Sequence, residues 1–275
     1  MVNYIHIREK FAERCFMDKN TLIIKILKLI TIALVIICSV GLLILGLLSI
    51  PDKNTEDPNG PAYPTGSDQT EIDLNNVILP QSADAGDEYI NKIYFVGDST
   101  TLHFYKGGID RSHIFVPNGG TLMLSSDILD IKVTDKNLSI PQAVKNANAE
   151  ILIITLGVNG ADSFSELSYK TYYKKLINAI KEASPNTKII LQSVFPITKD
   201  FSEKDKGISN AGIDRLNEWA KEIAVDCSLR YLDTQSILKN SDGAQIIEFS
   251  EGDGVHMNAS AYTRIIEYIK THAIN

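Results

Sequence analysis

Residues 92–101 read KIYFVGDSTT, and this stretch indicates the class of fold. Its first half is a short apolar run, which is typical of a β-strand buried on both faces. Gly97, Asp98 and Ser99 end the run, and Ser99 stands where a helix can begin. A buried strand that turns directly into a helix is the start of a β-α-β unit, so we expect an α/β protein.

Further along the chain the same pattern repeats. Apolar runs cover residues 114–116, 151–156, 188–194 and 229–232, and each is soon followed by glycine, proline or aspartate. Between them, apolar residues recur at helical spacing. These residues are Tyr169, Tyr172, Tyr173, Leu176, Ile177 and Ile180; Ile213, Leu216, Ala220, Ile223 and Ala224; and, after the possible cap Asn258, Ile265, Ile266 and Ile269. The alternation predicts a parallel, doubly wound sheet.

Residues 29–50 form a different kind of segment, which reads LITIALVIICSVGLLILGLLSI and carries no charge. A helix of this length spans about 33 Å, which matches a bilayer core of about 30 Å. The alternatives are a buried core helix or a cleaved signal peptide, whose apolar region is about 7–15 residues long. Because the run is longer than that, we expect a single uncleaved transmembrane helix.

Charge indicates the orientation of the chain. Residues 1–28 contain six Lys/Arg and three Asp/Glu, a net charge of +3, and the other 247 residues contain 21 and 31, a net charge of −10. The positive-inside rule predicts a cytoplasmic tail over residues 1–28 and an extracellular remainder. Residues 51–88 are rich in Pro, Gly, Asn and Asp and predict a flexible linker, in which Val77–Leu79 can dock on the folded domain of residues 89–275.

The composition excludes several classes of protein. Hydrophobic residues make up 44% of the chain and charged residues 22%, which excludes a collagen-like or wholly disordered protein. The acidic external part disfavours nucleic acid as a partner. Cys227 is the lone cysteine of residues 89–275, so we expect no disulfide within that domain.

Polar residues follow the predicted strands, at the edge where doubly wound sheets bind ligands. Ser99 follows the first strand, Gly119 and Gly120 the second, and Asn159 the third. Asp253 and His256 follow the last strand after an excursion of some twenty residues. A serine hydroxyl, an imidazole and a carboxylate that meet at one edge are the parts of a hydrolase with a serine nucleophile.

Each group has a chemical task in that interpretation. His256 can take the proton of Ser99 near neutral pH, and Asp253 can hold the imidazole in the right tautomer. The Ser99 backbone N–H, the Gly120 amide and the Asn159 side chain can bind the developing oxyanion. No Cys/His cluster has metal-ligand spacing, so we expect no metal site.

Three motifs carry a family resemblance: Gly97-Asp98-Ser99, Gly157-Val158-Asn159 and Asp253-Gly254-Val255-His256. They resemble, in order and spacing, blocks I, III and V of the SGNH (GDSL-type) hydrolase family. The resemblance covers about residues 90–275. It implies a flavodoxin-like sheet of five parallel strands without a cofactor.

The resemblance also implies a role for each site residue. Ser99 is the nucleophile, His256 the base and Asp253 its partner, while Gly120 and Asn159 are oxyanion donors. Gly119 competes with Gly120, and Gly120 is preferred because Gly120-Thr121-Leu122 reads as in members of the family.

The sequence departs from the family pattern at two positions. Gly160 stands where the third block usually has Asp, and Thr100 follows the serine where Leu is common. Asp98 is expected to shape the turn rather than react.

Other histidines near acidic residues have less claim to catalysis. Asp110 and His113 form a second Asp-x-x-His, but it precedes the second strand and should lie at the amino edge of the sheet. His103 lies one helical turn after Ser99 and can border the pocket, although a packed or surface role is favoured.

The main hypothesis is a membrane-anchored, externally facing esterase of a bacterial cell surface. It would remove small acyl groups, acetyl above all, from glycans or cell-wall polymers through an acyl-serine intermediate. A lipid or lysophospholipid esterase, or an acyltransferase with the same triad, is the runner-up. A tethered ligand-binding protein with an inactive triad is the alternative outside enzymes.

Overall fold

The computed structural model describes residues 74–117, 131–133, 136–204 and 207–274. At its centre is a parallel sheet of strand order β2-β1-β5-β6-β7. The strands are β1 (Ile93–Gly97), β2 (Ile114–Phe115), β5 (Ile151–Thr155), β6 (Lys188–Gln192) and β7 (Arg230–Leu232). All neighbouring pairs are parallel, so the prediction of a five-stranded, parallel α/β sheet is confirmed.

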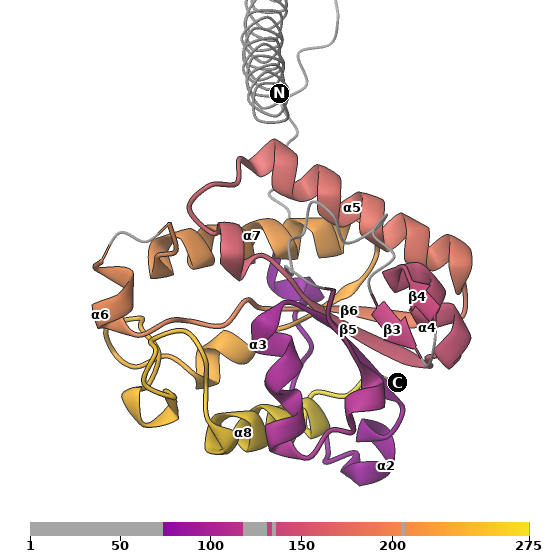
Figure 1. Ribbon diagram of the computed structural model, residues 1–275, viewed down its shortest axis with the longest axis horizontal. Helices are drawn as coiled ribbons and strands as arrows, with labels where there is room; N and C mark the ends of the chain where they lie inside the picture. Colours follow the sequence, from indigo (N-terminus) through magenta and orange to yellow (C-terminus); the bar gives the residue numbers. More distant parts are fainter. Residues whose placement is uncertain (1–73, 118–130, 134–135, 205–206, 275) are drawn as a thin grey trace, which may run out of the picture. The chain divides into compact units, whose positions relative to one another are not determined.

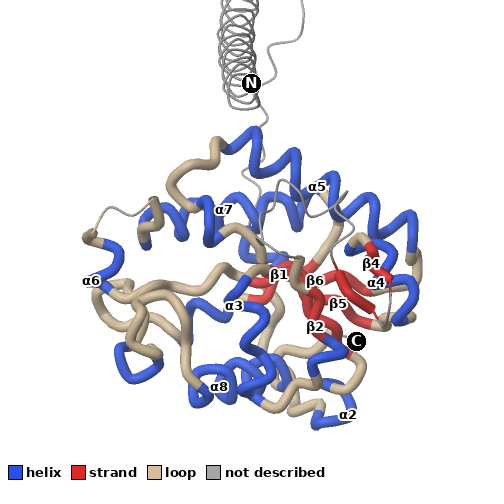
Figure 2. Tube along the Cα trace, in the orientation of Figure 1, coloured by secondary structure: helices blue, strands red, loops and turns tan. Residues whose placement is uncertain are grey.

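Helices cover both faces of this sheet (Figures 1 and 2). On one face pack α4 (Ile140–Ala147), α5 (Glu166–Ala183) and α7 (Asn210–Asp226), and on the other pack α2 (Gly86–Ile90), α3 (Ser99–Leu102) and α8 (Ala259–Lys270). Strand β5 explains the arrangement, because Leu152 and Ile154 belong to the first core while Ile151 and Ile153 belong to the second. Side chains alternate along a strand, so an unbroken apolar strand feeds two cores.

The predicted helix faces are buried, except that Tyr172 of α5 is half-buried against the core. Tyr169, Tyr173, Leu176, Ile177 and Ile180 of α5 lie in the core, and so does the predicted stripe of α7. Three caps stop these helices from fraying at their starts: Ser165 for α5, Ser209 for α7 and Asn258 for α8 each accept a hydrogen bond from the first turn.

Short elements complete the domain. An antiparallel pair of strands, β3 (Ile131–Val133) and β4 (Lys136–Leu138), precedes α4, and the sequence does not predict it. The turns of tighter helix are η1 (Leu74–Val77), η2 (His103–Gly107), η3 (Arg111–His113), η5 (Val158–Gly160), η6 (Thr234–Ile237) and η7 (Ile247–Phe249). Helix α6 (Lys199–Ser202) lies between β6 and α7.

Residues 74–79 pack on the edge strand β7. Ile78 forms a parallel bridge to Tyr231, and the Leu79 amide donates to the Tyr231 carbonyl at 2.8 Å. The predicted docking of Val77–Leu79 is therefore seen. The predicted transmembrane helix (residues 29–50) and the predicted cytoplasmic tail (residues 1–28) lie outside the described residues. Within the described part of the chain, no helix is long and apolar enough to cross a bilayer.

Candidate active site

Ser99 is the first residue of α3 and follows β1 after one intervening residue. Gly97 ends β1 where the chain must pass close to two neighbours. A Cβ at this position would lie 1.8 Å from Thr101 Oγ1 and 2.4 Å from the Thr155 carbonyl. Glycine is therefore required for α3 to begin this near the sheet. Ser99 stays half-buried at the carboxyl end of β1, where a substrate can reach it.

Asp98 shapes this turn, as the sequence predicts. It is the N-cap of α3, and its Oδ1 accepts from the Thr100 amide at 3.0 Å and from the Thr100 hydroxyl at 2.7 Å. Thr100, the departure from the family pattern, thus has a specific partner. Burial raises the pKa of Asp98, and the bonds from Thr100 and the nearby amides of Gly157 and Val158 offset part of that rise.

His256 joins Ser99 to Asp253. Its Nδ1 lies 2.6 Å from Asp253 Oδ2, and its Nε2 lies 3.0 Å from Ser99 Oγ. An ionised carboxylate can only accept, so it favours the tautomer with the proton on Nδ1. Nε2 is then free of its proton and accepts the hydrogen bond of the Ser99 hydroxyl. The structure thus brings the three predicted side chains together as a hydrogen-bonded hydroxyl, imidazole and carboxylate, and this geometry can activate a serine hydroxyl.

Asp253 also holds the loop that carries His256. Its Oδ1 accepts from the amides of Val255 and His256 at 2.9 and 2.8 Å. Partial burial raises the pKa of Asp253, but the bonds from the His256 side chain and these two amides outweigh it and hold the pKa below its ordinary value. Asp253 is therefore an anion at neutral pH and stabilises a protonated His256.

The predicted oxyanion donor Asn159 lies in η5, the turn after β5, and is exposed. Strand β5 pairs with β1, with Thr155 opposite Gly97, so this turn lies beside the one that carries Ser99. The Thr101 hydroxyl, which donates to the Thr155 carbonyl at 3.4 Å, links the two turns. Gly119 and Gly120, the other predicted donors, lie outside the described residues.

A close contact explains the glycine at position 160, where the family pattern usually has Asp. A Cβ at Gly160 would lie 2.4 Å from the aromatic ring of Phe164. An aspartate at this position would displace that ring. A different aspartate, Asp162, holds the turn, because its Oδ1 accepts from the hydroxyl of Ser209 at 2.6 Å. Helix α7, which begins after Ser209, thus supports the turn that carries Asn159.

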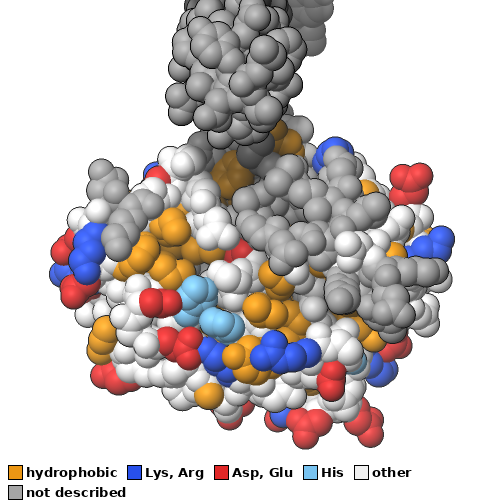
Figure 3. All heavy atoms as spheres, viewed as in Figure 1, with side chains coloured by type: hydrophobic (Ala, Val, Ile, Leu, Met, Phe, Trp, Pro, Cys, Tyr) orange, Lys and Arg blue, Asp and Glu red, His pale blue; other side chains and the backbone are white. Residues whose placement is uncertain are grey.

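A second ionisable group adjoins the triad. The His103 and His256 rings lie 4.8 Å apart, so the structure brings His103 to the site rather than leaving it merely packed or exposed. Lys106 forms an ion pair with Glu251 and donates to the Met257 carbonyl at 3.4 Å. Figure 3 shows histidine side chains flanked by acidic and basic ones on this face. Lys106 and Glu251 come from distant parts of the chain, so no sequence pattern points to them as partners.

These contacts influence both protonation and position. Burial is the main cause that holds the pKa of His103 below its ordinary value, and the charge of Lys106 adds to it. The carboxylates of Glu251 and Asp253 act in the opposite direction. Because Lys106 contacts both ends of the loop from Glu251 to Met257, it ties that loop to η2, which directly follows α3.

The second Asp-x-x-His motif lies at the other end of the sheet, as predicted. His113 Nδ1 is 2.9 Å from the carbonyl of Ile93, the first residue of β1, and its ring stacks on Tyr94. Asp110 caps the short helix η3. Within the described residues, no group of three or more His, Cys, Asp or Glu is arranged to hold a metal ion.

Comparison with known proteins agrees with this geometry. A sequence model described as the GDSL-like lipase/acylhydrolase family matches residues 129–264. The chain belongs to the GDSL (SGNH) hydrolase family. The matched residues of this GDSL hydrolase include Asn159, Asp253 and His256, and Ser99 joins them through its hydrogen bond to His256. The GDSL hydrolase is thus a serine hydrolase that acts on carboxylic esters.

Solved structures of similar proteins include other members of the family. A GDSL-like lipase from Bacteroides thetaiotaomicron is 17% identical, with a TM-score of 0.46 over 70% of this chain and 89% of the lipase. A carbohydrate acetylesterase from Sinorhizobium meliloti is 15% identical, with a TM-score of 0.43 over 65% of this chain and 95% of the esterase. The comparison of this GDSL hydrolase with curated proteins gives no match.

Proposed function

We propose that this GDSL hydrolase is a membrane-anchored esterase that removes acetyl groups from glycans or cell-wall polymers outside a bacterial cell. The observation that carries the chemical part is the unbroken chain of hydrogen bonds from Ser99 through His256 to Asp253. A tethered binding protein would have no need of a serine hydroxyl aligned with a paired imidazole. The proposed location is supported by the uncharged residues 29–50 and the basic residues before them.

The residues perform acyl transfer in two steps. Ser99 Oγ attacks the ester carbonyl carbon while His256 Nε2 takes the hydroxyl proton, and the Ser99 amide and Asn159 stabilise the oxyanion. The tetrahedral adduct then collapses: the bond to the alcohol oxygen breaks, His256 returns the proton to that oxygen, and an acyl–Ser99 ester remains. Water, deprotonated by His256, then attacks this ester. The bond to Ser99 Oγ breaks, His256 returns the proton to that oxygen, and the acid released ionises to acetate.

The test of the chemistry is hydrolysis of p-nitrophenyl acetate by the full-length chain, purified in mild detergent. We expect Ser99→Ala to lower the rate by at least about 10³-fold, because the variant lacks the hydroxyl that would form the acyl-enzyme. Ser112→Ala, which changes a serine at the opposite end of the sheet, is the matched control. Equal rates for wild type and Ser99→Ala would refute the proposal, and a fluorophosphonate probe should label the wild type but not Ser99→Ala.

The test of location uses intact cells that produce the chain with an epitope tag after residue 275. The proposal predicts that added protease removes the tag, while a tag before residue 1 survives until the cells are lysed. Survival of the C-terminal tag in intact cells, with digestion after lysis, would contradict the external location.

A further inference from the structure

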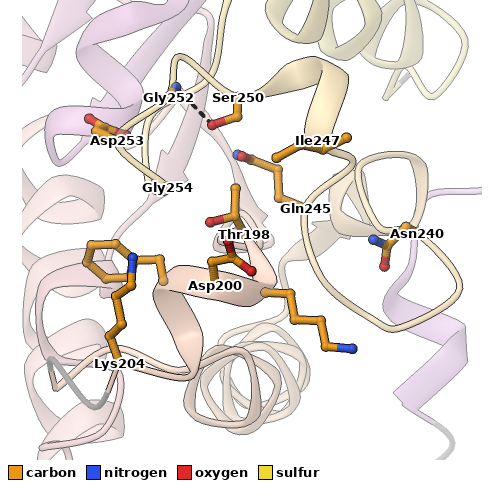
Figure 4. Close-up of a pocket in the computed structure, with 12 residues that line it drawn as sticks. Thr198, Asp200, Lys204, Asn240, Gln245, Ile247, Ser250, Gly252, Asp253 and Gly254 are labelled. Atoms are coloured by element: carbon orange, nitrogen blue, oxygen red, sulfur yellow. Dashed lines mark hydrogen bonds between the residues drawn. The ribbon is translucent and has the colours of Figure 1, made fainter.

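A pocket of about 440 Å³ lies beside the loop that carries the catalytic aspartate. Its walls come from α6 and the residues next to it, from the segment around Gln245, and from Ser250 to Gly254 (Figure 4). Neither Ser99 nor His256 lines it. It is therefore an additional space next to the reacting centre rather than the centre itself.

The pocket is joined to the catalytic machinery through Asp253. This residue lines the pocket, and its carboxylate also holds His256, whose other nitrogen contacts Ser99. The Thr198 amide donates to the Gly254 carbonyl at 2.9 Å, which fixes the opposite wall to the same loop. The pocket therefore adjoins the residue that holds His256 in its contact with Ser99.

Gln245 presents an unpaired acceptor at this pocket. Its side chain is 1% exposed, and its amide nitrogen donates to the Pro196 carbonyl at 3.4 Å. Its Oε1 is buried and has no hydrogen-bond partner among the described residues. The backbone amide of Gln245 is held by the Ile197 carbonyl at 2.9 Å, so the side chain starts from a fixed position. An unpaired buried carbonyl is unfavourable, and a ligand hydroxyl that reaches it would offset that cost.

The other lining groups favour a neutral, hydroxylated ligand. The formal charges of Lys199, Lys204, Asp200 and Asp253 cancel, so the lining offers no net attraction to an ion. Figure 4 shows Thr198, Gln245 and Ser250 around one opening. The Ser250 hydroxyl oxygen accepts from the Gly252 amide at 3.0 Å, and its proton can be donated to a ligand.

An apolar side chain stands among these polar groups. Ile247 lines the pocket and is 66% exposed, so its side chain is accessible to a ligand. A sugar ring has hydroxyl groups around its edge and C–H groups on its faces. It can therefore bind acceptors, donors and Ile247 together, whereas a lipid chain would leave the polar groups unpaired.

We infer that this pocket binds a sugar unit of the alcohol half of the ester, next to the acetylated position. The inference rests on the proposed esterase function and assigns Gln245, Ser250 and Asp200 to recognition of the glycan. A substrate without sugar gains nothing from the pocket, so the pocket makes the enzyme specific for glycan esters.

The experiment compares kcat/KM for partially acetylated xylo-oligosaccharides with kcat/KM for p-nitrophenyl acetate, using the full-length chain. We expect Gln245→Met, which removes an acceptor, and Asp200→Asn, which replaces a charged acceptor by a neutral one, each to lower the ratio of the two values by about fivefold to tenfold. Asp226→Asn, at the exposed end of α7, is the control for Asp200→Asn. Because Asp200 is exposed, that variant keeps the test valid if Gln245→Met fails to fold.

The outcomes separate the two proposals. Ratios within twofold of wild type in both variants would overturn the sugar pocket while leaving the esterase intact. If the wild-type chain hydrolyses neither ester, the proposed esterase function is refuted instead. Calorimetric titration with unacetylated xylo-oligosaccharide then tests the pocket by itself: weaker binding to Gln245→Met supports it, and equal or absent binding refutes it.

Discussion

Replacing Asp253 by Asn tests how the carboxylate acts on His256. Asparagine keeps an oxygen where Oδ1 accepts from the amides of Val255 and His256, so the loop retains its two anchors. The other carboxylate oxygen becomes an NH2 group that faces His256 Nδ1. Two donors cannot share that contact, and the imidazole therefore moves its proton to Nε2, where it faces Ser99 and can no longer accept a proton.

The size of the effect follows from the exposure of the site. In serine proteases with a buried aspartate, the same change lowers kcat by about 10⁴-fold. The Asp253 side chain is 52% exposed, so water can take over part of its role. We therefore expect kcat/KM for p-nitrophenyl acetate to fall by about 10³-fold, equivalent to about 4 kcal/mol.

Two companion variants make the result specific. Asp253→Ala removes the two amide bonds as well, so it should also lower the free energy of unfolding by about 1–2 kcal/mol, which Asp253→Asn should not. Asp110→Asn is the matched control, because Asp110 caps a turn before His113 in the same Asp-x-x-His spacing but far from Ser99. Folded Asp253→Asn that retains more than a tenth of wild-type kcat/KM would refute the tautomer argument.

Three further predictions concern the surroundings of the site. Because the pKa of His103 is lowered in the folded chain, the unfolded chain binds a proton at this residue at a higher pH than the folded chain does, and stability falls as pH drops below about 6.5. His103→Asn should therefore lose less melting temperature than wild type between about pH 7.5 and 5.5. An equal loss in both proteins would contradict this. Lys106→Met frees the loop from Glu251 to Met257 from η2 and should lower kcat about fivefold with little change in KM. Lys106→Arg should restore most of that kcat. A change in KM alone would argue against a positioning role. Ile154→Ala empties a fully buried position in β5 and should cost about 2–5 kcal/mol in urea unfolding, and a loss below about 1 kcal/mol would show that the core closes over the gap.

The sequence was informative wherever one strand or one turn decides the outcome. Apolar runs such as residues 151–156 can only be buried on both faces, and the loops after them must share an edge of the sheet. That reasoning alone brings Ser99, Asn159 and His256 to one rim. It gave no distances, and the hydrogen bonds of Ser99 and Asp253 to His256 come from the structure.

Features that depend on contacts between distant parts of the chain could not be predicted from the sequence. Lys106 and Glu251 are ordinary charged residues in sequence, and only the fold makes them partners. The three-residue strands β3 and β4 are too short and too polar for a periodic signal. The contact between Gly160 and Phe164 likewise turns an apparent departure from the family into a packing requirement.

The segment docked on β7 has a consequence for self-association. β7 lies at one end of the strand order, and its exposed amides and carbonyls would invite a strand from a neighbouring molecule. Ile78 and Leu79 occupy that position, and the guanidinium of Arg230 secures them by donating to the carbonyls of Asn76 and Ile78 at 3.1 and 3.0 Å. A shortened chain that begins at residue 89 would uncover the edge and tend to aggregate, so soluble versions should begin before Leu74.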